Sequence, residues 1–572
     1  MKLNTLSALA FSALLLSSCG GSFPEGKERI KADQIGYQVG TVKIAIVPDS
    51  TDGEFQLLDM EDNVVFTGKT QDARQWEFSG TSVKLADFSG FNREGLFYLR
   101  CKGAKDSYPF AIGHGIYHQL SHDAVKSYYY ARSGMEITEQ YGGKYARPLA
   151  HPDNHVIIHE SAAGPKRKAG DIISSPGGWY DAGDYNKYIV NSSISVWEIL
   201  NAVELYPEYS KNLKLNIPES GNAIPDVVDE LLYNLRWMIT MQDPDDGGVY
   251  HKLTQLKFCG MVMPEEDKDD RYVIQKSTSA ALDLAATCAK AYRVLEPYNS
   301  QLPGLRDSLM SVADKAWNWA QKNPGVLFKD NPEGVSTGTY GDSDIRDEFV
   351  WASIEMALAK GDAQYVKNVD DLCLTVPSWD SVSALGVISA LNDQKYKDLF
   401  DADFYDRMKN ALMAIAEKCL GTYSQSAYAT SLDIFPWGSN SEVANHGLVL
   451  VTAYKLIGDS KYLEAAQAAL HYILGRNPMD ICYVSGFGCR AVRNPHDRRS
   501  VADGVVNPVP GLLCGGPYAN AHGDVPDSLY LYTAPAMRYV DDYRSFTTNE
   551  IAINWNSALV FLSFAIDSES IK

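Results

Sequence analysis

Two aspartates, Asp181 and Asp184, stand three positions apart, and only an alanine and a glycine separate them. Both carboxylates can therefore point at one spot with no bulky side chain between them. Paired carboxylates can activate a water molecule, and the rings of Trp179 and Tyr180 beside them offer flat apolar faces to a sugar. A helix cap plus a turn aspartate is the alternative for an isolated pair, but the aromatic setting favours a carbohydrate site.

A third carboxylate that could act with the pair is Glu550, more than three hundred residues further along the chain. Read alone, Asn549 could cap a helix whose first turn carries Glu550, an arrangement that is favourable without being catalytic. Read with the aspartates, Glu550 supplies the separate acid that glycoside hydrolysis needs. The glycosidic oxygen must be protonated while a carboxylate on the opposite face of the ring drives a water or attacks directly.

The elements that must position these carboxylates are mostly helical. In the segment 226–241, apolar residues recur every three or four positions after a Pro-Asp start signal. Similar spacing predicts further helices at 118–130, 193–205, 277–295, 305–321, 347–359, 382–391, 404–418, 443–456, 462–474 and 553–564. So many helices with long connections predict a helical toroid. The unusually long connections 164–188 and 475–548 lead into the carboxylates, and loops of that length are usually functional.

The chain before residue 114 has a different, β-like texture. Short runs of β-branched and aromatic residues alternate with turn-forming stretches, as expected for strands. The clearest runs are 41–47, 54–58 and 96–100. Several short strands over this length predict a small antiparallel sandwich at 28–113, ahead of a helical domain at 114–572.

The first 27 residues read as a targeting segment and tether. Lys2 forms a short basic region, residues 6–16 form an apolar run too short to span a bilayer, and Leu-Ser-Ser-Cys ends at Cys19. This tetrapeptide resembles a bacterial lipobox, in which the cysteine is acylated; an ordinary cleaved signal is the alternative. We expect an exported bacterial lipoprotein held in the outer membrane through Cys19, on the cell surface or the periplasmic face.

Composition narrows the range of partners. Lys and Arg total 52 against 72 Asp and Glu, which gives a net charge of −20 and argues against a nucleic-acid partner. With 45% hydrophobic residues the chain is expected to be globular. Beyond Cys19, eight scattered cysteines show no zinc-ligand spacing, and we expect most to be buried thiols. We expect a monomer that requires no cofactor.

At this point the chain resembles glycoside hydrolase family 9, the inverting cellulases. The run Tyr-x-Asp-x4-Phe-x3-Glu-x-Ala-x3-Asn-Ser at 539–557 fits the family's C-terminal signature at every defined position. Segment 179–184 resembles the family's Asp-Ala-Gly-Asp motif, and 486–498 resembles its histidine signature. Residues 28–113 are similar to the immunoglobulin-like module that precedes the catalytic domain in one subgroup. The resemblance implies a mainly α fold, with an (α/α)6 barrel behind an immunoglobulin-like β-sandwich.

The resemblance also implies roles for the carboxylates. Asp184 matches the catalytic base, Asp181 the partner that helps hold the water, and Glu550 the acid. Asp541 matches a further aspartate of functional importance. Glu550 must stay protonated near neutral pH, which burial or a nearby anion can achieve by raising its pKa, and Asp541 is a candidate for that anion.

Other residues are expected to bind the sugar. His496 and Arg498 match cleft residues of the family that bind the sugar; a simple surface residue is the alternative for His496. Many relatives carry a second histidine where this chain has Asp497, which puts narrow substrate inference in doubt. Trp437 and Trp555 could be stacking platforms or core residues.

A structural calcium ion is also possible, because relatives often bind one. The acidic loops 243–246 and 265–270 offer oxygen ligands, but a solvated acidic loop is the simpler explanation of each. The sequence therefore leaves the metal ligands unknown.

The expected activity is inverting hydrolysis of β-1,4-glucosidic bonds in cellulose oligomers, mixed-linkage glucan, xyloglucan or glucomannan. The alternative is a catalytically weak, surface glycan-binding lipoprotein, which the intact Asp181, Asp184 and Glu550 disfavour. A polysaccharide lyase is a third possibility, but lyases that act on uronic acids favour a basic cleft, which the acidic balance disfavours.

Overall fold

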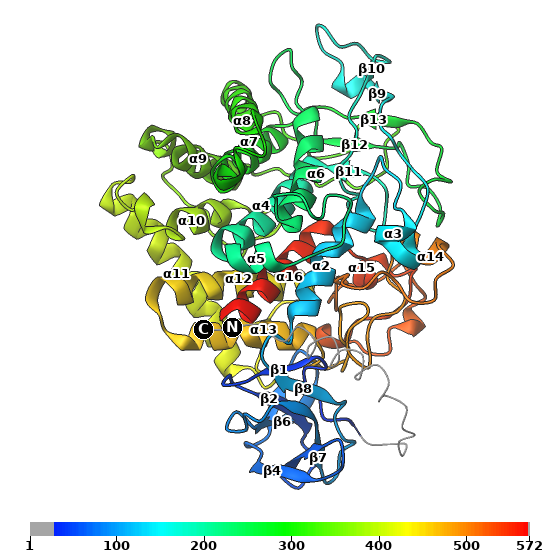
Figure 1. The fold of residues 1–572 in the computed structure, drawn as a ribbon, viewed down its shortest axis with the longest axis vertical. Helices are drawn as coiled ribbons and strands as arrows, with labels where there is room; N and C mark the ends of the chain where they lie inside the picture. Colours follow the sequence, from blue (N-terminus) through cyan, green and yellow to red (C-terminus); the bar gives the residue numbers. More distant parts are fainter. Residues whose placement is uncertain (1–27, 570–572) are drawn as a thin grey trace.

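The structure is a computed structural model that describes residues 28–569. Figure 1 shows a small β domain at one end of the molecule and a larger helical domain above it. The expected targeting segment and Cys19 lie outside the described residues. Within the described range, no helix combines the length and apolar character needed to cross a bilayer.

The β domain is a sandwich of two sheets, which confirms the predicted fold of this segment. One sheet has the order β1 (Gly36–Gln38), β8 (Phe110–Gly113), β7 (Gly95–Cys101), β3 (Glu54–Asp59), β4 (Val64–Lys69). The other has the order β2 (Ile44–Pro48), β6 (Thr81–Asp87), β5 (Arg74–Trp76). Alternate residues such as Phe55 and Leu57 on β3 point into a shared core with Phe97 and Leu99 on β7.

The helical domain contains every helix that the apolar spacing predicts. Its long helices are α2 (His118–Ala131), α4 (Ile189–Leu205), α6 (Asp226–Thr240), α7 (Thr278–Val294), α8 (Leu305–Lys322), α9 (Arg346–Lys360), α10 (Ser383–Leu391), α11 (Ala402–Gln425), α12 (Ser439–Ile457), α13 (Ser460–Ile473) and α16 (Ile553–Glu569). Successive packing of α4, α7, α9, α10, α12 and α16, with α16 returning to α4, closes a ring. The predicted helical barrel is therefore confirmed.

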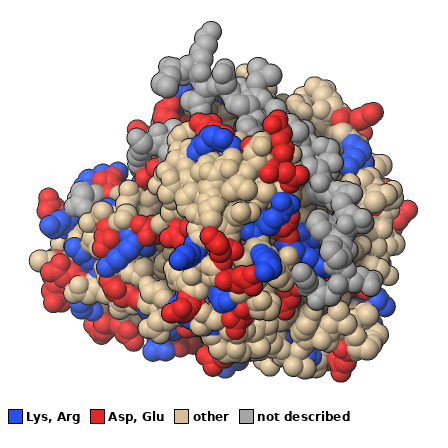
Figure 2. Space-filling model, turned by 90° about the horizontal axis from the view of Figure 1, so that it is seen from below, with Lys and Arg blue, Asp and Glu red and all other residues tan. Residues whose placement is uncertain are grey.

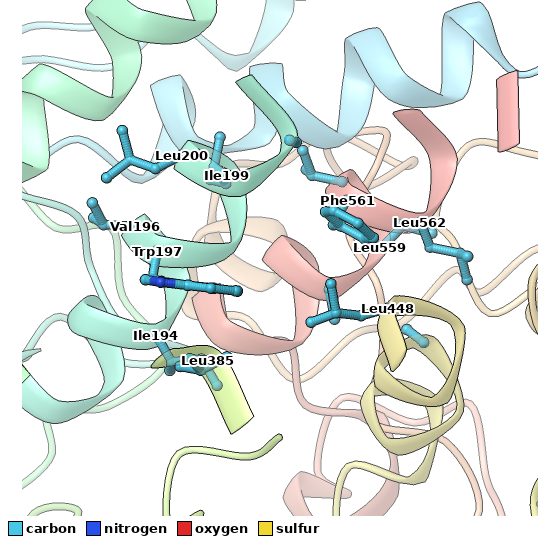
Figure 3. Packing of buried hydrophobic residues seen from close by; sticks show 14 of the residues in the cluster. Ile194, Val196, Trp197, Ile199, Leu200, Leu385, Leu448, Leu559, Phe561 and Leu562 are labelled. Atoms are coloured by element: carbon cyan, nitrogen blue, oxygen red, sulfur yellow. The ribbon is translucent and has the colours of Figure 1, made fainter. Parts of the chain in front are cut away.

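The ring helices are buried on nearly every face, whereas α8 and α11 each keep an exposed polar face. Figure 3 shows Trp197 of α4, Leu385 of α10, Leu448 of α12 and Leu559 of α16 gathered between these helices. All four side chains are fully buried. Burying each of them stabilises the fold by roughly 1.5–3 kcal/mol, and together they fix the ring that carries the loops.

A third sheet lies inside the helical domain, where the sequence predicted only irregular connections. Its order is β10 (Ile172–Ile173), β9 (Val156–Ile158), β13 (Arg271–Val273), β12 (Lys252–Thr254), β11 (Lys187–Tyr188). These strands are two or three residues long, too short to leave an alternating pattern. The sheet matters because β11 begins three residues after Asp184 and pairs with β12 in a fixed register.

The two domains share a buried polar interface. The Tyr117 hydroxyl lies 2.7 Å from the Gly36 carbonyl oxygen and 3.0 Å from Asp33 Oδ2. The Gln34 side chain donates to the Asp480 carbonyl and accepts from the Arg490 amide, at 3.1 and 2.9 Å. On the face seen in Figure 2, acidic and basic side chains are interspersed, and neither sign of charge covers it.

Candidate active site

Asp184 is held by two side chains that follow it closely in the chain. Its Oδ2 accepts a hydrogen bond from Asn186 Nδ2 at 2.7 Å and one from the Tyr188 hydroxyl at 3.3 Å. Its Oδ1 is buried and has no hydrogen-bond partner among the described residues. A buried carboxylate oxygen without a partner is unusual, and it suits a group that must accept a proton from water.

Asp181 has two neutral donors that the sequence did not reveal. Tyr340 donates its hydroxyl to Asp181 Oδ2 at 2.7 Å, and the Asn191 side chain donates to Oδ1. Burial, and then the charge of Asp184, raise the pKa of Asp181, while the Asn191 and Tyr340 hydrogen bonds oppose this rise. Neither donor lies in a recognisable motif; Tyr340 sits in a loop more than 150 residues downstream and has a positive φ of 45°.

Glu550 faces the aspartates from the other end of the chain. Its backbone forms a bridge with His496, and its carbonyl accepts from the Gly515 amide at 2.8 Å. Burial of the carboxyl raises the pKa of Glu550 well above its usual range, and the charges of Asp184 and Asp181 raise it further. The carboxyl can therefore keep its proton near neutral pH, as a general acid must.

Gly183 is the point where the aspartate loop and the histidine loop meet. A Cβ atom at this position would overlap the carbonyl oxygen and ring of His496. The Gly183 carbonyl accepts from Arg498 Nη1 at 2.6 Å, and Arg498 Nε donates to the Cys259 carbonyl at 3.2 Å. Arg498, expected to bind the sugar, is buried and orients the aspartate loop through these bonds.

Asp541 acts on the histidine loop rather than on Glu550. Its Oδ2 accepts from the Arg493 amide at 3.0 Å, and its Oδ1 accepts from the Asn494 amide at 2.8 Å. The Asn549 side chain also donates to Oδ1, at 3.1 Å. The expectation that Asp541 is the anion that raises the pKa of Glu550 is corrected, because the charges of Asp184 and Asp181 raise it instead.

His496 lies in this loop beside the aspartates. Its Nδ1 lies 2.6 Å from the Tyr543 carbonyl oxygen, which can only accept, so Nδ1 carries the hydrogen. Burial lowers the pKa of His496, which favours the neutral ring. Asp497 stands where many relatives have a second histidine. Its side chain is buried, caps α14 (Arg498–Ala502) and pairs with Arg499, so it is not an exposed group that could replace a sugar-binding histidine.

Two of the predicted sugar platforms are core residues instead. Trp179 is fully buried, and its Nε1 donates to Glu230 Oε1 at 2.9 Å. Tyr180 is also buried, with its hydroxyl 2.8 Å from His151 Nδ1. Direct stacking of these rings on a sugar is therefore excluded in this structure, because the aspartate loop turns them inward to anchor itself.

Other rings do face solvent near Glu550. Trp437 is 49% exposed and packs at 5.9 Å against Phe546, which is 40% exposed and lies four residues before Glu550. The Phe546 ring lies 6.1 Å from that of His496. Trp555 is partly buried beneath Gly438, where a Cβ atom would strike its indole. Trp437 and Phe546 therefore form an exposed aromatic surface beside the carboxylates.

Three carboxylate residues with metal-ligand spacing lie shortly after Tyr340 in the chain. Ligand atoms of Asp342, Asp347 and Glu348 lie within 4.8 Å of one another. Glu348 Oε2 and both carboxylate oxygens of Asp283, a buried residue of α7, have no hydrogen-bond partner among the described residues. Hard, oxygen-only ligands of this kind suit Ca²⁺.

The loops named from the sequence as calcium candidates are engaged elsewhere. Asp243 and Asp246 both pair with Lys276, at 2.7 and 2.8 Å. Asp267 lies 3.3 Å from His151 Nε2 and accepts from the Gln255 side chain. These contacts engage Asp243, Asp246 and Asp267 without a metal ion, whereas Glu265 Oε2 of the second loop is buried and has no hydrogen-bond partner among the described residues.

Family models match both parts of the chain. Residues 117–563 match the model described as glycosyl hydrolase family 9. Residues 25–106 match the model described as a cellulase N-terminal ig-like domain.

Curated relatives cover nearly the whole chain. A xyloglucan-specific endo-beta-1,4-glucanase, BoGH9A of Bacteroides ovatus, is 40% identical over 95% of this chain and 94% of its own length. Endoglucanase D of Acetivibrio thermocellus is 31% identical over 98% of this chain and 86% of its own.

Solved structures give the same picture. A Bacteroides ovatus GH9 structure has a TM-score of 0.87 at 38% identity and covers 95% of this chain and 99% of its own. The complex of AaCel9A with cellobiose-like isofagomine has a TM-score of 0.86 at 29% identity, with 95% and 100% covered.

Proposed function

The chain belongs to glycosyl hydrolase family 9, and on that premise we propose that it is an inverting hydrolase of β-1,4-glucosidic bonds in β-glucans. One observation carries the proposal. Asp184 presents an unpartnered carboxylate oxygen to the same site in which burial and two aspartates raise the pKa of Glu550. A carboxylate oxygen free to accept a proton and a separate carboxyl that can give one are the two groups that inverting hydrolysis needs.

We assign the roles from these environments. Glu550 gives its proton to the glycosidic oxygen as the bond to the anomeric carbon breaks. Asp184 Oδ1 accepts a proton from the water that attacks the opposite face of the ring. Asp181, held by Tyr340 and Asn191, orients that water beside Asp184. Neutral His496 and the aromatic surface of Trp437 and Phe546 bind the sugar near the carboxylates.

The substrate is a soluble or polymeric β-glucan. One relative acts on xyloglucan by its name, and xyloglucan is therefore our first candidate, ahead of cellulose oligomers, mixed-linkage glucan and glucomannan. The test is to incubate the purified protein with these four glucans and to measure released reducing ends. Release from at least one of them is expected. No release from any, together with measurable binding, would favour the glycan-binding alternative.

We propose that Asp342, Asp347 and Glu348 hold a structural calcium ion, with Asp283 nearby. Burial, and then the charges of Asp347 and Asp342, raise the pKa of Asp283, and a bound cation would neutralise this group of carboxylates. Because Asp342 lies two residues after Tyr340, the same residues would fix the loop that contacts Asp181. The ion takes no part in bond cleavage.

Removing calcium should therefore destabilise the protein. Treatment with EDTA is expected to lower Tm by roughly 5 °C, since a ligand that binds only the folded state stabilises it by mass action. Calorimetry with and without EDTA, and metal analysis of the purified protein, check this. A variant carrying Asp347→Asn and Glu348→Gln is the matched control and should no longer respond to EDTA. An equal Tm for metal-free and calcium-saturated protein would contradict the proposal.

We further propose that the protein is a monomer anchored in the outer membrane by acylated Cys19. The support is the lipobox-like sequence before it. A Cys19→Ser variant should move from the membrane fraction to the soluble fraction. Accessibility of the wild-type protein to added protease on intact cells separates the cell surface from the periplasmic face.

A further inference from the structure

Lys252 is a buried lysine close to the candidate site, and the proposed mechanism does not use it. It lies on β12, directly opposite Tyr188 in the register with β11, and its side chain is fully buried. Its Nζ donates to three neutral oxygens: Asn331 Oδ1 at 2.6 Å, the Gly338 carbonyl at 2.7 Å and Thr337 Oγ1 at 3.0 Å. None of these partners is a carboxylate, so no ion pair compensates the desolvation of the ammonium.

All three partners belong to one loop, residues 331–340, which ends at Tyr340. The Asn331 side chain also donates to the Thr337 carbonyl at 2.6 Å, and the Ser336 amide donates to the Leu256 carbonyl at 2.8 Å. The loop is therefore fastened to β12 and the residues after it at several points, with Lys252 at the centre. Tyr340 at its end has a positive φ of 45°, a conformation that a tyrosine keeps only when its surroundings hold it.

Thr254 at the end of β12 and the next residue, Gln255, also support Asp184. Thr254 Oγ1 lies 2.7 Å from Thr337 Oγ1 and 3.1 Å from Asn186 Oδ1. The Gln255 amide donates to Asn186 Oδ1 at 2.9 Å, and Asn186 in turn donates to Asp184. Hydrogen bonds thus run from β12 to Asp184 through Asn186, and from Lys252 through the loop and Tyr340 to Asp181.

Burial and the nearby charge of Asp184 act on the pKa of Lys252 in opposite directions. Burial lowers the pKa of Lys252 to about 7, and the negative charge of Asp184 opposes the fall. The ammonium lies 5.6 Å from the centre of the Tyr188 ring and 5.7 Å from that of Phe328. A methionine would fill similar space at a lower desolvation cost. Lys252 is therefore better explained by its hydrogen bonds to the loop 331–340 than by a contribution to the stability of the fold.

We infer that Lys252 is a positioning residue for the hydrolytic reaction: its ammonium fixes the loop 331–340 so that the Tyr340 hydroxyl holds Asp181 beside Asp184. This inference rests on the proposed function, because it concerns the water-activating side of the same site. It assigns no direct contact between Lys252 and the substrate.

The test compares Lys252→Met, Tyr340→Phe and the double variant. Lys252→Met should lower kcat by about 10- to 100-fold, the effect of slightly misplacing a catalytic group, and leave KM within about threefold. If Lys252 acts through Tyr340, the double variant should lose no more than about twofold beyond the more impaired single variant. A kcat within about twofold of wild type for Lys252→Met, or losses that multiply in the double variant, would overturn the inference.

Lys290→Met is the matched control. Lys290 is equally buried but pairs with Glu204 in the helical ring, and its replacement should lower Tm while leaving kcat unchanged. If Lys252→Met does not fold, Asn331→Ala removes one acceptor of the same ammonium and should give a smaller loss of kcat with the same coupling to Tyr340→Phe. Wild-type kcat in a folded Asn331→Ala variant would count against the inference.

A second readout does not depend on turnover. Amide hydrogens of residues 336–340 should exchange faster in Lys252→Met than in wild type, with exchange in the ring helices unchanged. Unchanged exchange in this loop would overturn the inference. If the wild-type protein hydrolyses no β-glucan, the proposed function fails, whereas the exchange measurement still reports whether Lys252 fixes the loop.

Discussion

Glu550→Gln should lower kcat on an unactivated β-1,4-glucan by about 10³-fold, the size of effect expected when a general acid is lost. Glutamine keeps the shape of the side chain but cannot give a proton to the glycosidic oxygen. In the wild-type enzyme, kcat/KM should fall as the pH rises through the pKa of Glu550, because the reaction needs the protonated carboxyl. Since burial and the two aspartates raise that pKa, the fall should lie above the usual carboxylate range.

A substrate with a good leaving group is the control for Glu550→Gln. In a dinitrophenyl β-glycoside of a cello-oligosaccharide, the dinitrophenolate group leaves without protonation. The variant should therefore lose much less activity on this substrate than on the glucan. Equal losses on both substrates would assign Glu550 to another role. Circular dichroism and Tm should match the wild type within a few degrees.

Asp184→Asn should lower kcat by a similar factor, about 10³-fold, but on both kinds of substrate. The attacking water needs a base whatever the leaving group is, and Asp184 Oδ1 is the carboxylate oxygen that lacks another partner. Kinetics on the glucan and on the activated glycoside distinguish this variant from Glu550→Gln.

Asp181→Asn is the matched comparison, because it changes the neighbouring carboxylate in the same way. Tyr340 and Asn191 already occupy both oxygens of Asp181, so we expect a smaller loss than for Asp184→Asn. A larger loss for Asp181→Asn would exchange the roles assigned to the two aspartates.

The sequence predicted much of the fold because helices and strands leave periodic patterns. Each predicted helix is present, but the ends differ from the prediction; α11 runs from Ala402 to Gln425 against an expected 404–418, seven residues longer at its C-terminal end. The short strands β10 and β11 were missed, since two residues hold no period. Their pairing depends on contacts with β9 and β12 from other parts of the chain.

The carboxylates of the site were predictable because motifs name them, whereas their supports were not. Asn186 and Tyr188 lie beside the aspartate motif, but only the backbone register shows that both reach Asp184. Tyr340 reaches Asp181 from a distant loop without a motif. For Trp179 the sequence suggested a role that the structure does not support. Its position next to a catalytic motif predicted stacking on a sugar, but tertiary packing buries the ring, whose Nε1 donates to Glu230.

The most direct test of the central claim is the anomeric configuration of the first product. Proton NMR during hydrolysis of a β-1,4-glucan, recorded before mutarotation equilibrates the ends, separates the two outcomes. Direct attack by water opposite Glu550 inverts the anomeric carbon, so the α-anomer should appear first. Initial release of the β-anomer would contradict the assignment of Asp184 as a base that activates water.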